Sequence, residues 1–161
     1  MTRVWILLTL LLATGVTFGQ TVPKPPKGVE AKYDRFKDTT TVSMRGVGRG
    51  YASMDIVFFY DGQTISKDVE DFYLVFSAFG RCSGFCFNRA DLILLIDGQR
   101  ERLSYIDALT DRALFVASRE ILTRIANADT VEYQVGSRDG KVRDDGPRRI
   151  RELLEYARKP D

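Results

Sequence analysis

The amino-acid sequence predicts an α+β domain with a largely antiparallel sheet of about six or seven strands and two C-terminal helices packed on it. The region up to about residue 117 consists mostly of short β-branched and aromatic segments, and the remainder reads helix, strand, helix. The early segments are joined by turns too short for the crossover helices that parallel strands require. A β-sandwich edged by helices is the alternative.

Four early segments have the composition of strands. Thr39–Met44 is short and β-branched, Met54–Tyr60 and Phe72–Phe79 are rich in aromatic and β-branched residues, and Leu92–Ile96 is continuously apolar. In the last three segments both alternating faces are apolar. This pattern predicts central strands that are covered on both sides.

Three Asp-Gly pairs mark candidate turns, because Asp and Gly tolerate the positive φ angles of tight hairpins. They are Asp61-Gly62, Asp97-Gly98 and Asp139-Gly140. The strongest hairpin signal is Asp97-Gly98, which follows the apolar run LILLI. The segment Val131–Val135 alternates apolar and polar residues, which predicts a half-exposed strand before a weaker turn at Asp139-Gly140.

The C-terminal region carries two helix signals. Ser118 can cap a helix over residues 119–128, where apolar residues recur at helical spacing. A second helix can be capped by Asp144 or Asp145 and has Pro147 in its first turn. Its apolar stripe consists of Ile150, Leu153, Leu154 and Ala157.

The N-terminal residues have the layout of an export signal. Residues 1–19 carry Arg3, then a short apolar run, then small and polar residues, which is typical of a cleaved secretory signal peptide. An uncleaved anchor is the alternative. Residues 20–28 are rich in proline and predict an extended tether, and residues 29–161 form a single domain. We therefore expect a periplasmic or secreted protein with no stable membrane insertion after cleavage.

Composition excludes several classes of activity. Lysine and arginine number 24 and aspartate and glutamate 22, and this near balance argues against a nucleic-acid partner. The chain contains no histidine, which rules out Ser–His, Cys–His and His-ligated metal mechanisms. No motif indicates a metal or a cofactor, and no catalytic residue can be assigned.

The two cysteines are Cys82 and Cys86, in the sequence Cys-Ser-Gly-Phe-Cys. In an exported protein an even cysteine count favours a disulfide, which requires the chain to turn at Gly84. Free thiols and a redox pair are the alternatives. A loop closed by this disulfide would present Phe85 as an apolar anchor for a partner.

A glycine-rich segment runs Arg-Gly-Val-Gly-Arg-Gly-Tyr, with glycines at positions 46, 48 and 50. Its G-x-G-x-G spacing and the strand that follows do not match the dinucleotide-binding pattern. We interpret it as a flexible or bulged connection between strands. Exposed Arg45, Arg49 and Tyr51 would be available there for an anionic or carbohydrate partner.

These features favour a monomeric or weakly associating binding module whose partner is an unknown envelope or extracellular component. Two other functions stay open. One is a histidine-independent hydrolase that uses carboxylates. The other is a carrier whose sheet encloses a small apolar ligand.

Overall fold

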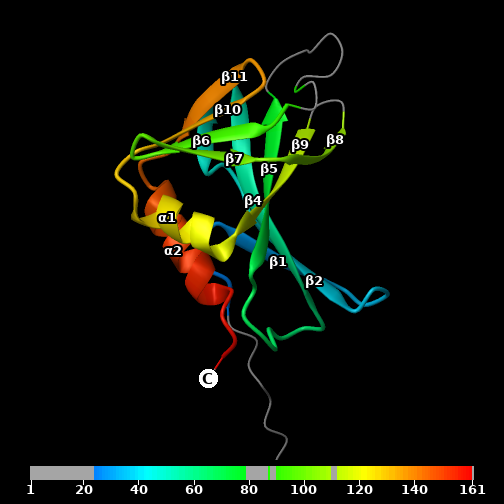
Figure 1. Ribbon diagram of the computed structural model, residues 1–161. Helices are drawn as coiled ribbons and strands as arrows, with labels where there is room; N and C mark the ends of the chain where they lie inside the picture. The colour runs from blue at the N-terminus through cyan, green and yellow to red at the C-terminus, as the bar shows by residue number, and fades with distance from the viewer. Residues whose placement is uncertain (1–23, 79–86, 88–89, 110–111, 161) are drawn as a thin grey trace, which may run out of the picture.

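The computed structural model describes residues 24–78, 87, 90–109 and 112–160, which form two antiparallel sheets and two helices (Figure 1). The α+β class is confirmed. The large sheet has the strand order β1-β2-β4-β5-β9-β8, with the bounds β1 Val29–Asp34, β2 Thr39–Met44, β4 Ala52–Asp61, β5 Asp71–Ala78, β9 Arg112–Ser118 and β8 Tyr105–Leu109. The small sheet has the order β3-β11-β10-β6-β7, with β3 Gly48–Gly50, β11 Arg138–Val142, β10 Val131–Val135, β6 Leu92–Ile96 and β7 Gln99–Leu103.

The number and grouping of the strands differ from the single sheet of six or seven that the sequence predicts. The described residues form eleven strands, six in one sheet and five in the other. Short strands such as β3 are too brief to show a period of two, so the sequence does not reveal them. The two sheets contact one another through Phe76 of the large sheet and Tyr133 of the small one.

The core lies between the inner faces of the sheets. Alternate residues of β2, β4, β5 and β9 are buried, and Phe76 on β5 contacts Tyr133 on β10 with ring centroids 5.1 Å apart. Further along the same face, Phe72 packs edge-on against Phe58 at 5.4 Å. The small sheet therefore covers one end of this face, and the helices cover the end near Phe72 (Figure 1).

The helices begin where the sequence predicts. Helix α1 spans Arg119–Asn127, and the Ser118 hydroxyl accepts a hydrogen bond from the Ile121 N–H at 3.3 Å. Helix α2 spans Gly146–Tyr156 with Pro147 in its first turn, but the Asp145 side chain makes no capping hydrogen bond. The Asp145 carboxylate instead forms an ion pair with Arg143, with 3.4 Å between Oδ1 and Nε. Neither helix of the described residues combines the length and the apolar character that a bilayer crossing needs.

Arg119 joins three parts of the domain at the junction of β9 and α1. Its guanidinium donates hydrogen bonds to the carbonyls of Val69 (2.8 Å), Leu154 (3.2 Å) and Ala157 (2.8 Å). Two of these carbonyls lie at the C-terminal end of α2, where a positive charge also favours the helix dipole. This side chain therefore holds α2 against the large sheet.

The outer face of the large sheet corrects one sequence prediction. Strands β4 and β5 are central, but no described strand or helix packs over their second face (Figure 1). Phe59 on that face is 47% exposed, and its ring contacts Tyr73 at 5.4 Å. Apolar residues on both faces therefore indicate a central position without indicating a second cover.

The structure confirms one of the predicted Asp-Gly turns and contradicts another. Asp97-Gly98 forms the β6–β7 hairpin with φ angles of 50° and 79°, which confirms that prediction. The Asp97 carboxylate also accepts hydrogen bonds from the N–H groups of Asp129 (3.0 Å) and Thr130 (2.8 Å). The prediction of a turn at Asp139-Gly140 is wrong, because both residues lie inside β11. The chain turns earlier, at Gly136, which has φ 60°.

Candidate binding site

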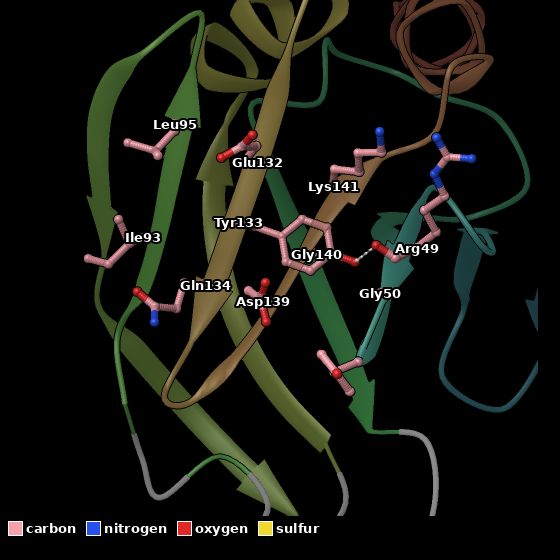
Figure 2. Close-up of a pocket in the computed structure, with 11 residues that line it drawn as sticks. Arg49, Gly50, Ile93, Leu95, Glu132, Tyr133, Gln134, Asp139, Gly140 and Lys141 are labelled. Carbon is pink, nitrogen blue, oxygen red and sulfur yellow. Dashed lines mark hydrogen bonds between the residues drawn. The ribbon is translucent and has the colours of Figure 1, made fainter.

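A hollow of about 700 Å³ lies on the exposed face of the small sheet (Figure 2). This volume falls within the usual range for small-molecule sites. Strands β3, β11, β10 and β6 contribute its lining, together with Tyr51 between β3 and β4. The lining residues are Arg49, Gly50, Tyr51, Ile93, Leu95, Glu132, Tyr133, Gln134, Asp139, Gly140 and Lys141.

Strand register brings the polar residues of the hollow together. On β10, Glu132 lies opposite Lys141 of β11 on one side and Leu95 of β6 on the other. Two residues along, Gln134 lies opposite Asp139 and Ile93 in the same way. Because side chains two residues apart on a strand share a face, all of these project from the outer face of the sheet.

Glycines at the edge of the hollow make room for the ring of Tyr133. A Cβ atom on Gly140 would lie 2.5 Å from the Tyr133 ring and hydroxyl, and a Cβ on Gly48 would lie 2.6 Å from that hydroxyl. A Cβ on Gly50, which has φ 144°, would lie 2.6 Å from the carbonyl oxygen of Asp139. The glycine-rich segment is thus not a flexible connection but part of a packed strand pair, β3 and β11.

The Tyr133 hydroxyl lies within hydrogen-bond distance of backbone carbonyls at both ends of the segment from Arg49 to Ala52. It donates to the carbonyl of Ala52 at 2.7 Å and approaches the carbonyl of Arg49 at 3.2 Å (Figure 2). Burial, with a smaller contribution from the negative charge of Asp139, raises the pKa of Tyr133 to about 12. The hydroxyl therefore stays protonated at neutral pH and remains a donor.

Charges of both signs line the hollow. Arg49 forms an ion pair with Asp144 outside it, with 3.3 Å between Nη2 and Oδ1. Lys141, Glu132 and Asp139 are all exposed. Two cationic and two anionic side chains thus line the site, so it carries no net charge at neutral pH.

The structure brings together two of the four contact residues predicted from the sequence. Arg49 and Tyr51 line the hollow, and Tyr51 is 67% exposed. Arg45 does not line it. Its guanidinium lies 3.5 Å from Glu30, and its carbonyl accepts a hydrogen bond from Arg149 at 2.9 Å.

The cysteine turn lies outside the described residues. This holds for Cys82, Cys86 and the predicted anchor Phe85. The signal segment 1–19 and the first part of the tether also lie outside them.

Sequence reasoning missed most of the lining. The alternation in Val131–Val135 indicated that Glu132 and Gln134 face away from the core, but nothing local showed which strands lie beside them. Ile93 and Leu95 belong to a continuous apolar run, so they were expected to be covered, and they are half-buried in the floor of the hollow.

The acid groups of the described residues do not gather into a metal site: no three acidic or cysteine side chains there are close enough together to hold an ion. The hollow does place two carboxylates, Glu132 and Asp139, on neighbouring strands. These carboxylates can accept hydrogen bonds from a ligand, and Gln134 and Lys141 can donate them.

Next to the hollow, Asp91 directly precedes β6 and contacts Arg102 of β7, the strand partner of Ile93. Its carboxylate accepts hydrogen bonds from Arg102 Nε at 2.6 Å and from the Tyr105 N–H at 3.3 Å. The hydrogen bond from Arg102, supported by that from Tyr105, lowers the pKa of Asp91 below its ordinary 3.8. Because the folded-state pKa is the lower one, this contact stabilises the fold above the ordinary value and is lost as the pH falls through the folded-state pKa.

We expect Asp91→Asn to lower the thermal unfolding midpoint near neutral pH, because Arg102 loses its anionic partner. The difference from wild type should shrink in strongly acidic buffer, where the Asp91 carboxylate is protonated. Thermal unfolding followed by circular dichroism over a pH series measures it. A difference that stays constant down to acid pH would contradict this account.

The fold and the hollow together define the class of the protein: a two-sheet α+β domain with an open site on one sheet face. Comparison with protein-family models, with curated proteins and with solved structures finds no match to this chain.

Proposed function

We propose that this chain is an exported protein that acts by binding, and that the hollow on the small sheet is its ligand site. The N-terminal pattern supports export, since residues 1–19 combine a basic start, an apolar run and a small-residue end. The partner would be a component of the envelope or the extracellular space.

One observation carries the binding role. Tyr51 is 67% exposed at the rim of the hollow, and within the described part of the chain no hydrogen bond or ring contact holds its side chain. The same hollow is lined by carboxylate, amide, ammonium and guanidinium groups and by the half-buried Ile93 and Leu95. A concave site with an apolar floor and a few convergent polar groups is typical of ligand recognition.

Mass analysis of the protein recovered from its producing cells tests the export step. The expected chain begins at Gln20, and alkylation before and after reduction shows whether Cys82 and Cys86 are bonded to each other. Recovery of the chain with residues 1–19 attached, in the cytosolic fraction, would contradict export.

Chemical-shift mapping tests the binding step. The ¹⁵N-labelled mature protein is titrated with four separate probe classes: short peptides, nucleotides, fatty acids and oligosaccharides. We expect at least one class to shift the amide signals of Gly50, Tyr51 and Gly140, while Gly62, on the far side of the domain, stays unchanged. If no class shifts the signals around the hollow, the binding role of this site is wrong.

The two carboxylates of the hollow favour one second candidate, a histidine-independent hydrolase. Glu132 and Asp139 are diagonal neighbours in the β10–β11 ladder, because their direct partners are Lys141 and Gln134. Diagonal positions of a ladder are about 7–8 Å apart at the backbone, so both carboxylates project from one face of the sheet. Glycoside hydrolysis commonly uses such a pair of carboxylates. Both side chains are exposed, which favours binding over acid–base work, since a general acid is usually desolvated to raise its pKa.

Product analysis separates the hydrolase from the binding module. Incubation of the protein with an oligosaccharide, followed by chromatography, is expected to return the intact sugar. Release of shorter sugars that is abolished by Glu132→Gln, with binding retained, would establish the hydrolase instead.

The packing of the protein interior gives little support to the alternative function, a carrier that encloses an apolar ligand. Large fully buried side chains fill the interior of the domain, among them Phe58, Phe72, Phe76, Phe87 and Phe115. Such close packing favours a ligand site on the surface over one in the interior.

A further inference from the structure

The chemistry of the hollow also indicates what kind of ligand it takes, an inference that rests on the proposed binding function. The floor consists of Ile93 and Leu95, two residues apart on β6 and both half-buried. On β10 this small apolar strip lies beside Glu132 and Gln134, and Asp139 and Lys141 follow on β11 (Figure 2). On its other side, β7 places Arg100 and Arg102 opposite Leu95 and Ile93. An aliphatic chain would desolvate those charges without pairing them, which disfavours a lipid.

The backbone around the hollow disfavours a peptide added as a strand. Strands β11, β10 and β6 each have a hydrogen-bonded neighbour on both sides, so their N–H and C=O groups are used within the sheet. A peptide lying across this face would find only side chains as partners. Strand addition needs an unpaired edge. The edge strand that lines the hollow, β3, is only three residues long, and the rest of the hollow lies over the face of the sheet.

The charge balance disfavours a polyanion. Arg49 and Lys141 are offset by Glu132 and Asp139, and Arg49 is already paired with Asp144 at 3.3 Å. A phosphate or sulfate polymer gains affinity from an excess of cations, which this surface lacks. A lining of balanced charge that carries both donors and acceptors instead suits a ligand without net charge that donates and accepts hydrogen bonds.

The remaining features match a sugar. The exposed ring of Tyr51 can stack on the C–H face of a pyranose, because those polarised hydrogens meet the negative face of the ring. Glu132, Gln134 and Asp139 end in planar groups that can accept from two neighbouring hydroxyls at once, and Gln134 and Lys141 can also donate. We propose that this hollow binds a neutral oligosaccharide, with Tyr51 as the stacking platform.

Calorimetric titration of the full mature protein tests this proposal. The probes are neutral trisaccharides of glucose, xylose and N-acetylglucosamine, an acidic trisaccharide of galacturonate, and a neutral tripeptide. We expect at least one neutral trisaccharide to bind, and Tyr51→Ala to weaken it about tenfold through loss of the stacked ring. Tyr51→Phe retains the ring and should stay within about threefold of wild type.

Matched controls keep the result specific to the hollow. Phe36→Ala removes another exposed aromatic side chain, 86% exposed in the β1–β2 turn, and should leave the affinity unchanged. Raising the salt from about 50 to about 500 mM should change the affinity less than about twofold, because the site has no net charge. Thermal unfolding shows whether each variant is folded, and exposed Tyr51 should tolerate replacement.

Each outcome decides something different. Binding of the tripeptide or the acidic sugar at the hollow, with no binding of a neutral trisaccharide, overturns the ligand class and leaves the binding function standing. Neutral trisaccharide binding that Tyr51→Ala does not weaken overturns the placement of the sugar in the hollow. Failure of every probe, here and in the shift mapping, removes the proposed function as well.

Discussion

Replacing Arg119 by alanine is expected to lower the free energy of unfolding by about 3 kcal/mol or more, because a hydrogen bond from a charged donor contributes about 1.5–3 kcal/mol. The variant leaves three carbonyls, those of Val69, Leu154 and Ala157, without their donor. It also removes the guanidinium that lies 5.8 Å from the ring centroid of Phe72. Urea unfolding followed by circular dichroism measures the loss.

Two further variants identify the cause. Arg119→Lys keeps the charge but lacks the planar fork, so an intermediate loss is expected. Arg112→Ala removes an exposed arginine from the same strand and should change stability by less than about 0.5 kcal/mol. If Arg119→Ala is as stable as Arg112→Ala, the guanidinium does not hold α2 in place.

Replacing Gly140 by alanine is expected to destabilise the protein by about 2–3 kcal/mol through overpacking. The new Cβ would lie 2.5 Å from the ring and hydroxyl of Tyr133 and 2.6 Å from the carbonyl oxygen of Arg49. Neither neighbour can retreat easily, since Tyr133 is buried and Arg49 belongs to the paired strand β3. Denaturant unfolding gives the change.

The matched control is Gly62→Ala. Gly62 has φ 72° and open space around its Cβ position, so alanine there introduces only backbone strain, about 1 kcal/mol. The contact with the ring is tested by Tyr133→Leu, which removes the ring and hydroxyl. Gly140→Ala should cost less in that background than in wild type, and equal costs in both would show that the ring is not responsible.

The candidate site could be predicted in part from the sequence. The glycine-rich segment drew attention to Arg49 and Tyr51, and both line the hollow. Its glycines are needed because the ring of Tyr133 packs against them, and Tyr133 is 84 residues from Arg49 along the chain. No local pattern connects such distant positions, because a glycine selected for close packing looks the same as one selected for a turn.

The sequence by itself determined the features that depend on neighbouring residues. These are the α+β class, the Asp97-Gly98 hairpin and the start of α1 at Ser118. Tertiary structure alone decided the division into two sheets, the place of Asp139-Gly140 inside β11, and the hollow with its residues from four strands. The physical reason is that turns and caps are set by contacts a few residues apart, whereas strand register and sheet facing are set by burial between distant segments.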